Sequence, residues 1–208
     1  MKKILYSVAL AACCMGTMTS CSDFLDASNK SNVTDKQTFA TKEGFNSLVN
    51  DAYQHLQNVY AAPLFTSCFS AGTDMYADAR NKMNEPLNTY ETLTPENTDI
   101  KNLYTYLYAG IRAANSVSYY AQTAQVDDKT KGQLVGEARV LAAYEYYLLV
   151  NNFGGVPIMK DFLTTADTGY PKSSAADVYA YIISELEDVI SKNVLQASTA
   201  TKGGGRIS

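Results

Sequence analysis

Apolar side chains recur every three or four residues in two long stretches, one between residues 43 and 60 and the other between residues 98 and 124. This spacing places them on one face of an α-helix, so we predict two amphipathic helices. In the first stretch they are Phe45, Leu48, Val49, Ala52, Leu56, Val59 and Tyr60. In the second they are Ile100, Leu103, Tyr104, Leu107, Ile111, Ala114 and Val117. Thr94 and Pro95 are the expected N-terminal cap and first turn of the second helix, with Asn97 or Thr98 as later alternatives.

A third helix is predicted from Asp127 or Asp128 through the segment GEARVLAAYEYYLLV. Because its second half is apolar nearly all round, we expect it to be buried among other helices. It should end at NNFGG, where Gly154 or Gly155 can supply a left-handed C-terminal cap, and the following VPI should be extended.

A fourth helix should begin at Ser173 or Ser174, because Ser174 and Asp177 have the spacing of a capping box. Its apolar stripe consists of Val178, Ile182, Leu186 and Val189. The sequence has no strand-rich region, so the predicted fold is all-α and built from helix pairs.

The stretch from residue 65 to 93 has weak periodicity, many Asp, Asn and Thr residues, and Pro86. Long irregular segments are uncommon in compact domains and often carry function. This stretch is therefore the first place to look for a binding site.

The N-terminus has the pattern of a signal peptide: Lys2 and Lys3, an apolar run from Ile4 to Ala12, and small or polar residues up to Ser20. The run is too short to span a bilayer, which takes roughly 20 apolar residues. A cysteine follows at once, which predicts a lipoprotein with a diacylglyceryl group on Cys21. Residues 1–20 are then a signal peptide, 21–37 a lipidated tether and 38–208 the helical domain.

Two alternatives compete with lipidation of Cys21. Cys13 follows Leu-Ala-Ala, which is locally the better lipoprotein box. A disulfide would leave only Cys68 as the partner, and Cys68 is better interpreted as a small buried thiol. The spacing of the cysteines does not fit a metal site.

Composition excludes several classes of function. The formal net charge is −4 and no Lys/Arg cluster occurs, which argues against a nucleic-acid partner. The single histidine, His55, excludes any site with two imidazoles, and no Ser, Cys or acidic partner is evident near it, so it is interpreted as a packing or surface residue. No cofactor and no metal are expected. The 16 tyrosines suit helix packing and also suit sugar binding.

The segment GEARVLAAYEYYLLVNNFGGVPI resembles the SusD/RagB family of Bacteroidetes outer-membrane lipoproteins. Residues 136–139, Leu141 and 153–157 agree with the family motif, whereas Val140 and Ala142 depart from it. The segments CSDFLD, RAANSV, DVYAYIISELEDVI and GRIS resemble other family segments in the same order. Family members are usually more than twice this length, and GRIS resembles the start of a further helix, so the sequence is expected to be an N-terminal portion.

The resemblance implies tetratricopeptide-like helix pairs and a function in binding rather than catalysis. Family members sit on the cell surface at the outer membrane and hold glycans, or peptides in some branches. They pass these ligands to a SusC-like TonB-dependent transporter, which they cover as a lid. A helical-repeat scaffold that binds only protein is the alternative, and an enzyme is not expected.

Sugar sites combine an aromatic platform with Asp, Asn and Arg side chains, and the segment TDMYADARNKMNEPLNTY contains all of these. The candidate ligand-binding residues are Tyr76, Asp78, Arg80, Asn81 and Tyr90. An ordinary surface loop is the alternative. Glu137 and Arg139 are two positions apart on a helix and cannot face each other, so each is expected to form an ion pair elsewhere.

Overall fold

The computed structural model describes residues 35–61, 63–76, 85–165, 169–195 and 206–207. All the regular secondary structure in this part of the chain is helical, which confirms the all-α prediction. The helices are α3 (Asp35–Ala40), α4 (Lys42–Tyr60), α5 (Leu64–Phe69), α6 (Glu85–Thr89), α7 (Thr98–Tyr120), α8 (Asp128–Phe153) and α9 (Ala175–Lys192).

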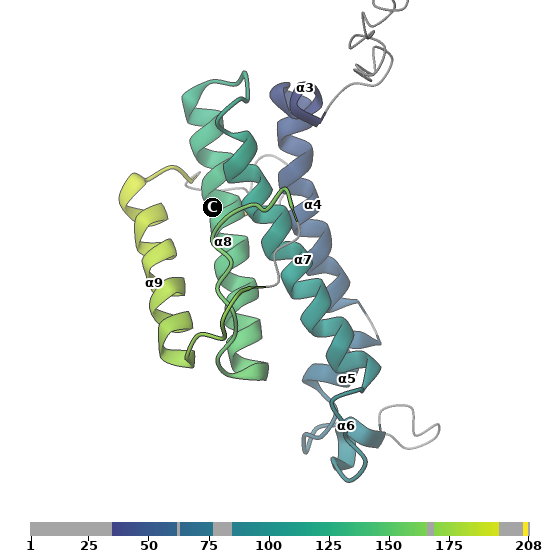
Figure 1. Cartoon of the computed structure of the whole chain (residues 1–208). Helices are drawn as coiled ribbons and strands as arrows, with labels where there is room; N and C mark the ends of the chain where they lie inside the picture. The colour runs from purple at the N-terminus through teal and green to yellow at the C-terminus, as the bar shows by residue number, and fades with distance from the viewer. Residues whose placement is uncertain (1–34, 62, 77–84, 166–168, 196–205, 208) are drawn as a thin grey trace, which may run out of the picture. The chain divides into compact units, whose positions relative to one another are not determined.

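The four long helices form an antiparallel array in chain order, shown in Figure 1. Helix α7 packs against both α4 and α8, α8 also contacts α4, and α9 packs against α8. We refer to α4, α7, α8 and α9 as the helical array. This arrangement follows from the sequence, because each amphipathic stripe needs a neighbouring helix to cover it.

Two apolar clusters fill the array. One joins the first half of α4 to the end of α7 and the start of α8, around Phe45, Val49 and Val117. The other joins α7, α8 and α9 around Leu107, Leu149 and other fully buried side chains. Burying each side chain of this size contributes about 1.5–3 kcal/mol, so the clusters dominate the stability of the array.

The helix ends confirm several of the sequence predictions. The side chain of Asp127 caps α8, and the helix ends before Gly154, whose φ +70° and ψ −136° lie outside the left-handed helical region that was expected. Ser174 and Asp177 form the predicted capping box of α9. The cap of α7 is Asn97, whose side-chain oxygen accepts from the amides of Asp99 and Ile100.

Thr94 and Pro95 are therefore not the start of α7. The backbone amide of Asn97 donates to the carbonyl of Thr94, which makes these residues a turn that precedes the helix. Asn97 was one of the alternative caps offered by the sequence. It caps α7 because its side-chain oxygen accepts hydrogen bonds from two backbone amides at the helix end.

Two regions differ from the sequence analysis. Helix α3 begins at Asp35, so the last residues assigned to the tether are helical. The irregular stretch 65–93 contains α5 and α6. Helices of five or six residues are too short to produce a periodic stripe, and they are held here by burial of Leu64 and Leu87. The signal peptide, Cys13 and Cys21 lie outside the described residues.

The pair Glu137 and Arg139 behaves as expected, with each side chain bound to a different helix or segment. Glu137 is fully buried and accepts from Arg206 Nε at 2.7 Å. Arg139 donates to Glu185 at 2.7 Å and to Asp188, both on α9. These ion pairs fasten residue 206 and α9 to α8.

His55 has an acidic neighbour, contrary to the sequence analysis. Its Nε2 lies 3.8 Å from Asp51 Oδ1, one turn earlier on α4. The residue still fits a structural position, because its side chain is mostly buried and its charged neighbour in the described part of the chain is this carboxylate on the same helix.

No helix in the described ranges is long and apolar enough to cross a membrane.

Candidate functional site

The segment predicted to carry the site forms a small lobe at one end of the array. We define the α5–α6 lobe as residues 63–76 and 85–90. Helix α5 packs against α7 and α4, and α6 packs only against α5 among the described helices. Figure 1 shows this lobe next to the end of α4 and the start of α7. The lobe is thus attached to the array through α5.

Tyr90 is the most distinctive residue of the lobe. The residue is 57% exposed, and its backbone has φ +63°. A left-handed backbone is a genuine outlier for a bulky side chain and costs of order 1–3 kcal/mol. The surrounding structure must therefore hold the residue in place.

Gly72 supplies the surface on which Tyr90 rests. Gly72 has φ +75°, and a Cβ at this position would overlap the Tyr90 hydroxyl. The Gly72 amide donates to Asn88 Oδ1 at 3.4 Å, which ties the two stretches of the lobe together. The edge of the tyrosine is fixed by the backbone of residue 72, while much of its ring remains in solvent.

The other predicted site residues are only partly described. Tyr76 is half-buried at the end of the stretch 63–76, and its amide donates to the carbonyl of Thr73. Asp78, Arg80 and Asn81 lie outside the described residues. Tyr76 and Tyr90 therefore belong to the same lobe, although no contact between their rings is found in the described part of it.

A second group of aromatic side chains was missed by the sequence analysis. We define the aromatic face as Tyr60, Phe65, Phe69, Tyr144 and Tyr147. Ring centroids of Tyr60 and Phe65 are 5.3 Å apart, as are those of Phe65 and Phe69, and Tyr144 stacks on Tyr147 at 6.2 Å. The Tyr60 and Tyr144 hydroxyls are hydrogen-bonded to each other.

The hydroxyl of Tyr60 in the aromatic face stays protonated near neutral pH. Burial and the hydrogen bond to Tyr144 raise the pKa of Tyr60 to about 12. The face gathers residues from α4, α5 and α8, which no local pattern in the sequence connects. The only sequence signal for this face was the occurrence of tyrosines in a helix that was predicted to be buried.

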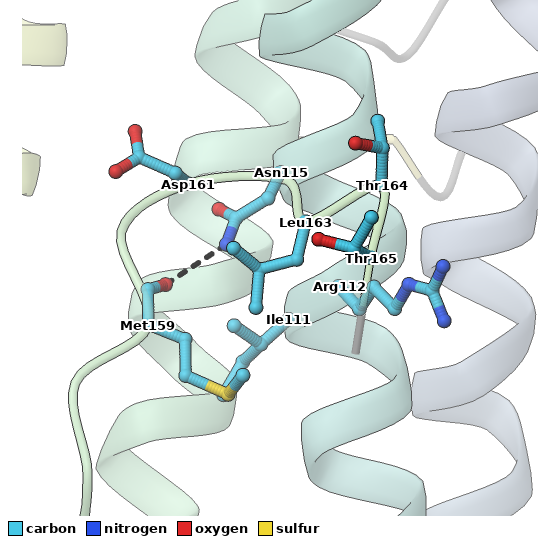
Figure 2. A pocket seen from close by; sticks show the side chains of 8 residues that line it. All are labelled: Ile111, Arg112, Asn115, Met159, Asp161, Leu163, Thr164 and Thr165. Carbon is cyan, nitrogen blue, oxygen red and sulfur yellow. Dashed lines mark hydrogen bonds between the residues drawn. The ribbon is translucent and has the colours of Figure 1, made fainter. Parts of the chain in front are cut away.

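The described residues also form a cavity on α7, which we call the α7 cavity. Its volume is about 280 Å³. The lining residues are Ile111, Arg112, Asn115, Met159, Asp161, Leu163, Thr164 and Thr165. Figure 2 shows side chains of α7 facing the segment that follows α8.

The segment that follows α8 forms the second wall of this cavity. Its lining residues are Met159, Asp161, Leu163, Thr164 and Thr165. Phe162 packs against Tyr120 in the apolar cluster instead. Successive side chains of an extended chain point to opposite sides, so from Met159 to Leu163 one segment both anchors itself and lines the cavity.

The charged groups at the α7 cavity are not used in ion pairs within the described part of the chain. Figure 2 places the guanidinium of Arg112 and the carboxylate of Asp161 on opposite sides of Leu163. The Arg112 guanidinium lies 5.4 Å from the centre of the Phe162 ring, and the Asn115 amide donates to the carbonyl of Met159 at 2.8 Å. The cavity thus combines an apolar floor with donors and acceptors.

Cys68 is the thiol in the described part of the chain. Burial, together with the charge of Asp99, raises the pKa of the Cys68 thiol to about 11, which disfavours the thiolate nucleophile. Cys68 is half-buried and its thiol is free, as the sequence analysis expected. Among the residues that the structure covers, no group of three or more His, Cys, Asp or Glu side chains could hold a metal ion.

Comparison with known proteins identifies the family. Residues 23–200 match the model of the SusD-like family described as starch-binding and associating with the outer membrane. The chain therefore belongs to the SusD-like family. A SusD-like protein of Formosa agariphila is 28% identical over 190 residues, which are 89% of this chain and 36% of that protein.

Solved structures share the helical array. Surface glycan-binding protein A from Bacteroides uniformis is 26% identical, with a TM-score of 0.67 over 80% of this chain and 38% of that one. The corresponding protein from Bacteroides thetaiotaomicron, in complex with laminarihexaose, is 23% identical, with a TM-score of 0.65 over 81% of this chain and 36% of that one. The chain thus spans little more than a third of the length of these relatives.

Proposed function

We propose that the protein is a cell-surface lipoprotein of the outer membrane that binds a glycan or oligosaccharide. Membership of a starch-binding, outer-membrane family supports the ligand class and the location. In the part of the chain that the structure describes, the observation that carries the proposal is the exposed ring of Tyr90, held in a strained backbone against Gly72. Strained residues cluster at binding sites because the surrounding structure fixes them for contact with a ligand.

Binding would combine stacking and hydrogen bonding in the lobe. The ring of Tyr90, and that of Tyr76, would stack on the apolar faces of sugar rings, while Asp78, Arg80 and Asn81 would bond hydroxyl groups. A tyrosine suits this contact because it joins a flat apolar ring to a polar edge. A peptide is the second ligand class that such a site could hold.

The partner that we propose is a SusC-like TonB-dependent transporter, to which the bound glycan would be passed. The lipid anchor on Cys21 would keep the lobe at the membrane next to that transporter. Each buried CH₂ of an acyl chain contributes about 0.8 kcal/mol, so several chains on one residue give firm attachment. Cys21→Ala should abolish incorporation of labelled palmitate and release the protein from membranes.

Cys13→Ala is the matched control for the anchor, because Cys13 is the competing lipidation position. Labelling that persists in Cys21→Ala and disappears in Cys13→Ala would transfer the anchor to Cys13. Labelling that persists in both variants would exclude lipidation at either cysteine.

Binding in the lobe is tested by replacing Tyr90 with residues that keep the left-handed backbone. Asn tolerates this conformation, so Tyr90→Asn removes the ring without adding strain. Titration calorimetry with laminarihexaose and maltohexaose should show an affinity loss of about tenfold or more, which corresponds to about 1.4 kcal/mol. Tyr90→Phe keeps the ring and should retain most of the affinity.

Exposed side chains away from the lobe provide the controls. Tyr179 is 39% exposed on α9, and Glu187 is exposed on the same helix. Tyr179→Ala and Glu187→Ala should bind as the unchanged protein does, whereas Asp78→Ala and Arg80→Ala should bind more weakly. Equal affinity of the Tyr90→Asn variant and these controls would mean that the lobe does not hold the glycan.

A helical-repeat scaffold that binds only protein is the second candidate function. The observation that favours it is the aromatic face, in which Tyr60, Phe65, Tyr144 and Tyr147 are each 37–47% exposed. Exposed aromatic groups are typical of protein interfaces. If neither oligosaccharide binds and a Tyr144→Ala, Tyr147→Ala double variant loses the transporter in pull-down, the scaffold is the better description.

A further inference from the structure

We infer that the α7 cavity binds one neutral sugar residue, as a second contact for a glycan whose first contact is the α5–α6 lobe. The inference rests on the proposed function and adds a site to it. The cavity lies on α7 and on the segment after α8, so none of its lining residues belongs to the lobe. Its occupation can therefore be measured separately from that of the lobe.

The charges at the cavity favour a ligand without net charge. Arg112 and Asp161 carry opposite charges on the two sides of Leu163. Arg112 lies over the Phe162 ring, and neither charged group is in a salt bridge with another described residue. In the neighbouring cavity among α7, α8 and α9, by contrast, Arg139 is already bound to Glu185 and Asp188. A carboxylate can accept from two adjacent hydroxyls, and a guanidinium can donate to ring or hydroxyl oxygens.

The remaining lining also matches a sugar ring. The hydroxyls of Thr164 and Thr165 can each donate and accept a hydrogen bond. Ile111, Met159 and Leu163 form an apolar surface, visible together in Figure 2, against which the C–H face of a ring can pack. A volume of about 280 Å³ lies near the lower end of the range for small-molecule pockets, which suits one sugar residue rather than a long segment of polymer.

The wall of the cavity is held in position before any ligand arrives. The amide of Met159 donates to the Tyr146 hydroxyl at 2.7 Å, and its carbonyl accepts from Asn115 at 2.8 Å. Phe162 packs between Tyr119 and Tyr120, with ring centroids 5.3 and 5.9 Å away. Because the segment is fixed at these points, binding does not require it to be ordered, which favours affinity.

Two methionines allow the two contacts to be observed in one experiment. Met159 lies on the cavity floor, whereas Met75 is 93% exposed in the α5–α6 lobe. The full chain, labelled with ¹³C at the methionine methyl groups, is titrated with laminarihexaose and maltohexaose and followed by NMR. Met159→Leu and Met75→Leu assign the two signals.

Glycan binding at both contacts should shift both methyl signals. A shift of the Met75 signal without any shift of the Met159 signal would overturn the cavity contact and leave the proposed function standing. Absence of any shift and of any heat of binding with both oligosaccharides would overturn the two proposals together.

Substitutions that preserve shape then test the named groups. Asp161→Asn and Thr165→Val should each weaken binding on the order of three- to tenfold, because each removes a hydrogen-bonding function and little volume. Lys160→Gln is the matched control, since Lys160 is on the same segment but lies 5.5 Å from the centre of the Tyr181 ring on α9. Affinities of both cavity variants equal to that of the control would contradict the inference.

Discussion

The helical array and the α5–α6 lobe differ in helix length and in the amount of apolar surface that they bury. The array has long helices whose buried faces form two apolar clusters. The lobe has helices of six and five residues, and its buried apolar side chains are Leu64, Ala71 and Leu87. Helices this short have no stability of their own, so the lobe depends on contacts with the array. The comparison indicates that stability resides in the array and that recognition can be placed in the lobe.

Strain and unpaired polar groups also differ between the two regions. The lobe holds Tyr90 in a left-handed backbone. The array instead contains two buried glutamates on α8 with different surroundings. Glu137 accepts from Arg206, Gln133 and Tyr53. Glu145 is fully buried, has no hydrogen-bond partner among the described residues, and lies against Gly110 of α7.

The largest expected effect separates the two regions by stability. Phe45→Ala removes a fully buried ring from the array and should lower the free energy of unfolding by about 3–5 kcal/mol, as measured by urea denaturation. Leu87→Ala should instead increase hydrogen exchange in the lobe while the array amides remain protected. Loss of protection throughout the array in Leu87→Ala would show that the two regions unfold together.

The next effect concerns the unpaired glutamate of the array. Burial raises the pKa of Glu145 well above its ordinary value. The unfolded chain then releases this proton above about pH 4.3 while the folded chain keeps it, so stability falls as pH rises from there to the folded pKa. Glu145→Met should remove that slope and raise the free energy of unfolding at pH 7 by about 1–3 kcal/mol.

Glu137→Gln is the matched control for this prediction, because Glu137 is buried on the same helix but hydrogen-bonded. The substitution weakens the bond from Arg206 and should lower the free energy of unfolding at pH 7 by about 1–3 kcal/mol. The two glutamates should therefore respond with opposite signs. Destabilisation by Glu145→Met of the same size would mean that the Glu145 carboxyl has a partner.

The smallest effect measures the strain in the lobe. Tyr90→Gly relieves the strain of the left-handed backbone and should slow hydrogen exchange at the neighbouring lobe amides. The gain in local stability should be about 1 kcal/mol at most, because the contact of the ring with Gly72 is lost as well. Tyr90→Ala keeps the strain and loses the ring, so it should speed exchange. Equal exchange in these two variants would show that the backbone of residue 90 is not strained.

The long helices could be predicted because their signals are local. The stripes from Phe45 to Tyr60 and from Ile100 to Val117 repeat at the helical period, and the capping box of Ser174 uses residues three positions apart. The ion pairs of residues 137 and 139 could be expected, but not their partners. Glu185 is 46 positions from Arg139, and Arg206 is 69 positions from Glu137.

The candidate site was predicted less completely. Composition singled out the segment of Tyr76 and Tyr90, yet the hydroxyl end of Tyr90 packs against Gly72, eighteen positions earlier in the chain. The α7 cavity escaped the sequence analysis because it joins Arg112 and Asn115 to a segment that begins at Met159. Contacts over such separations leave no periodic trace in the sequence.

The sequence by itself determined the all-α class, the four long helices and the family motif at residues 136–157, because each depends on side chains within a few turns of one another. Tertiary structure alone decided which faces were left uncovered. The exposed ring of Tyr90, the aromatic face and the α7 cavity all arise where helices distant in the chain meet. Tertiary packing determines which polar and aromatic groups remain exposed, because the same residue type is buried at Tyr146 and exposed at Tyr147.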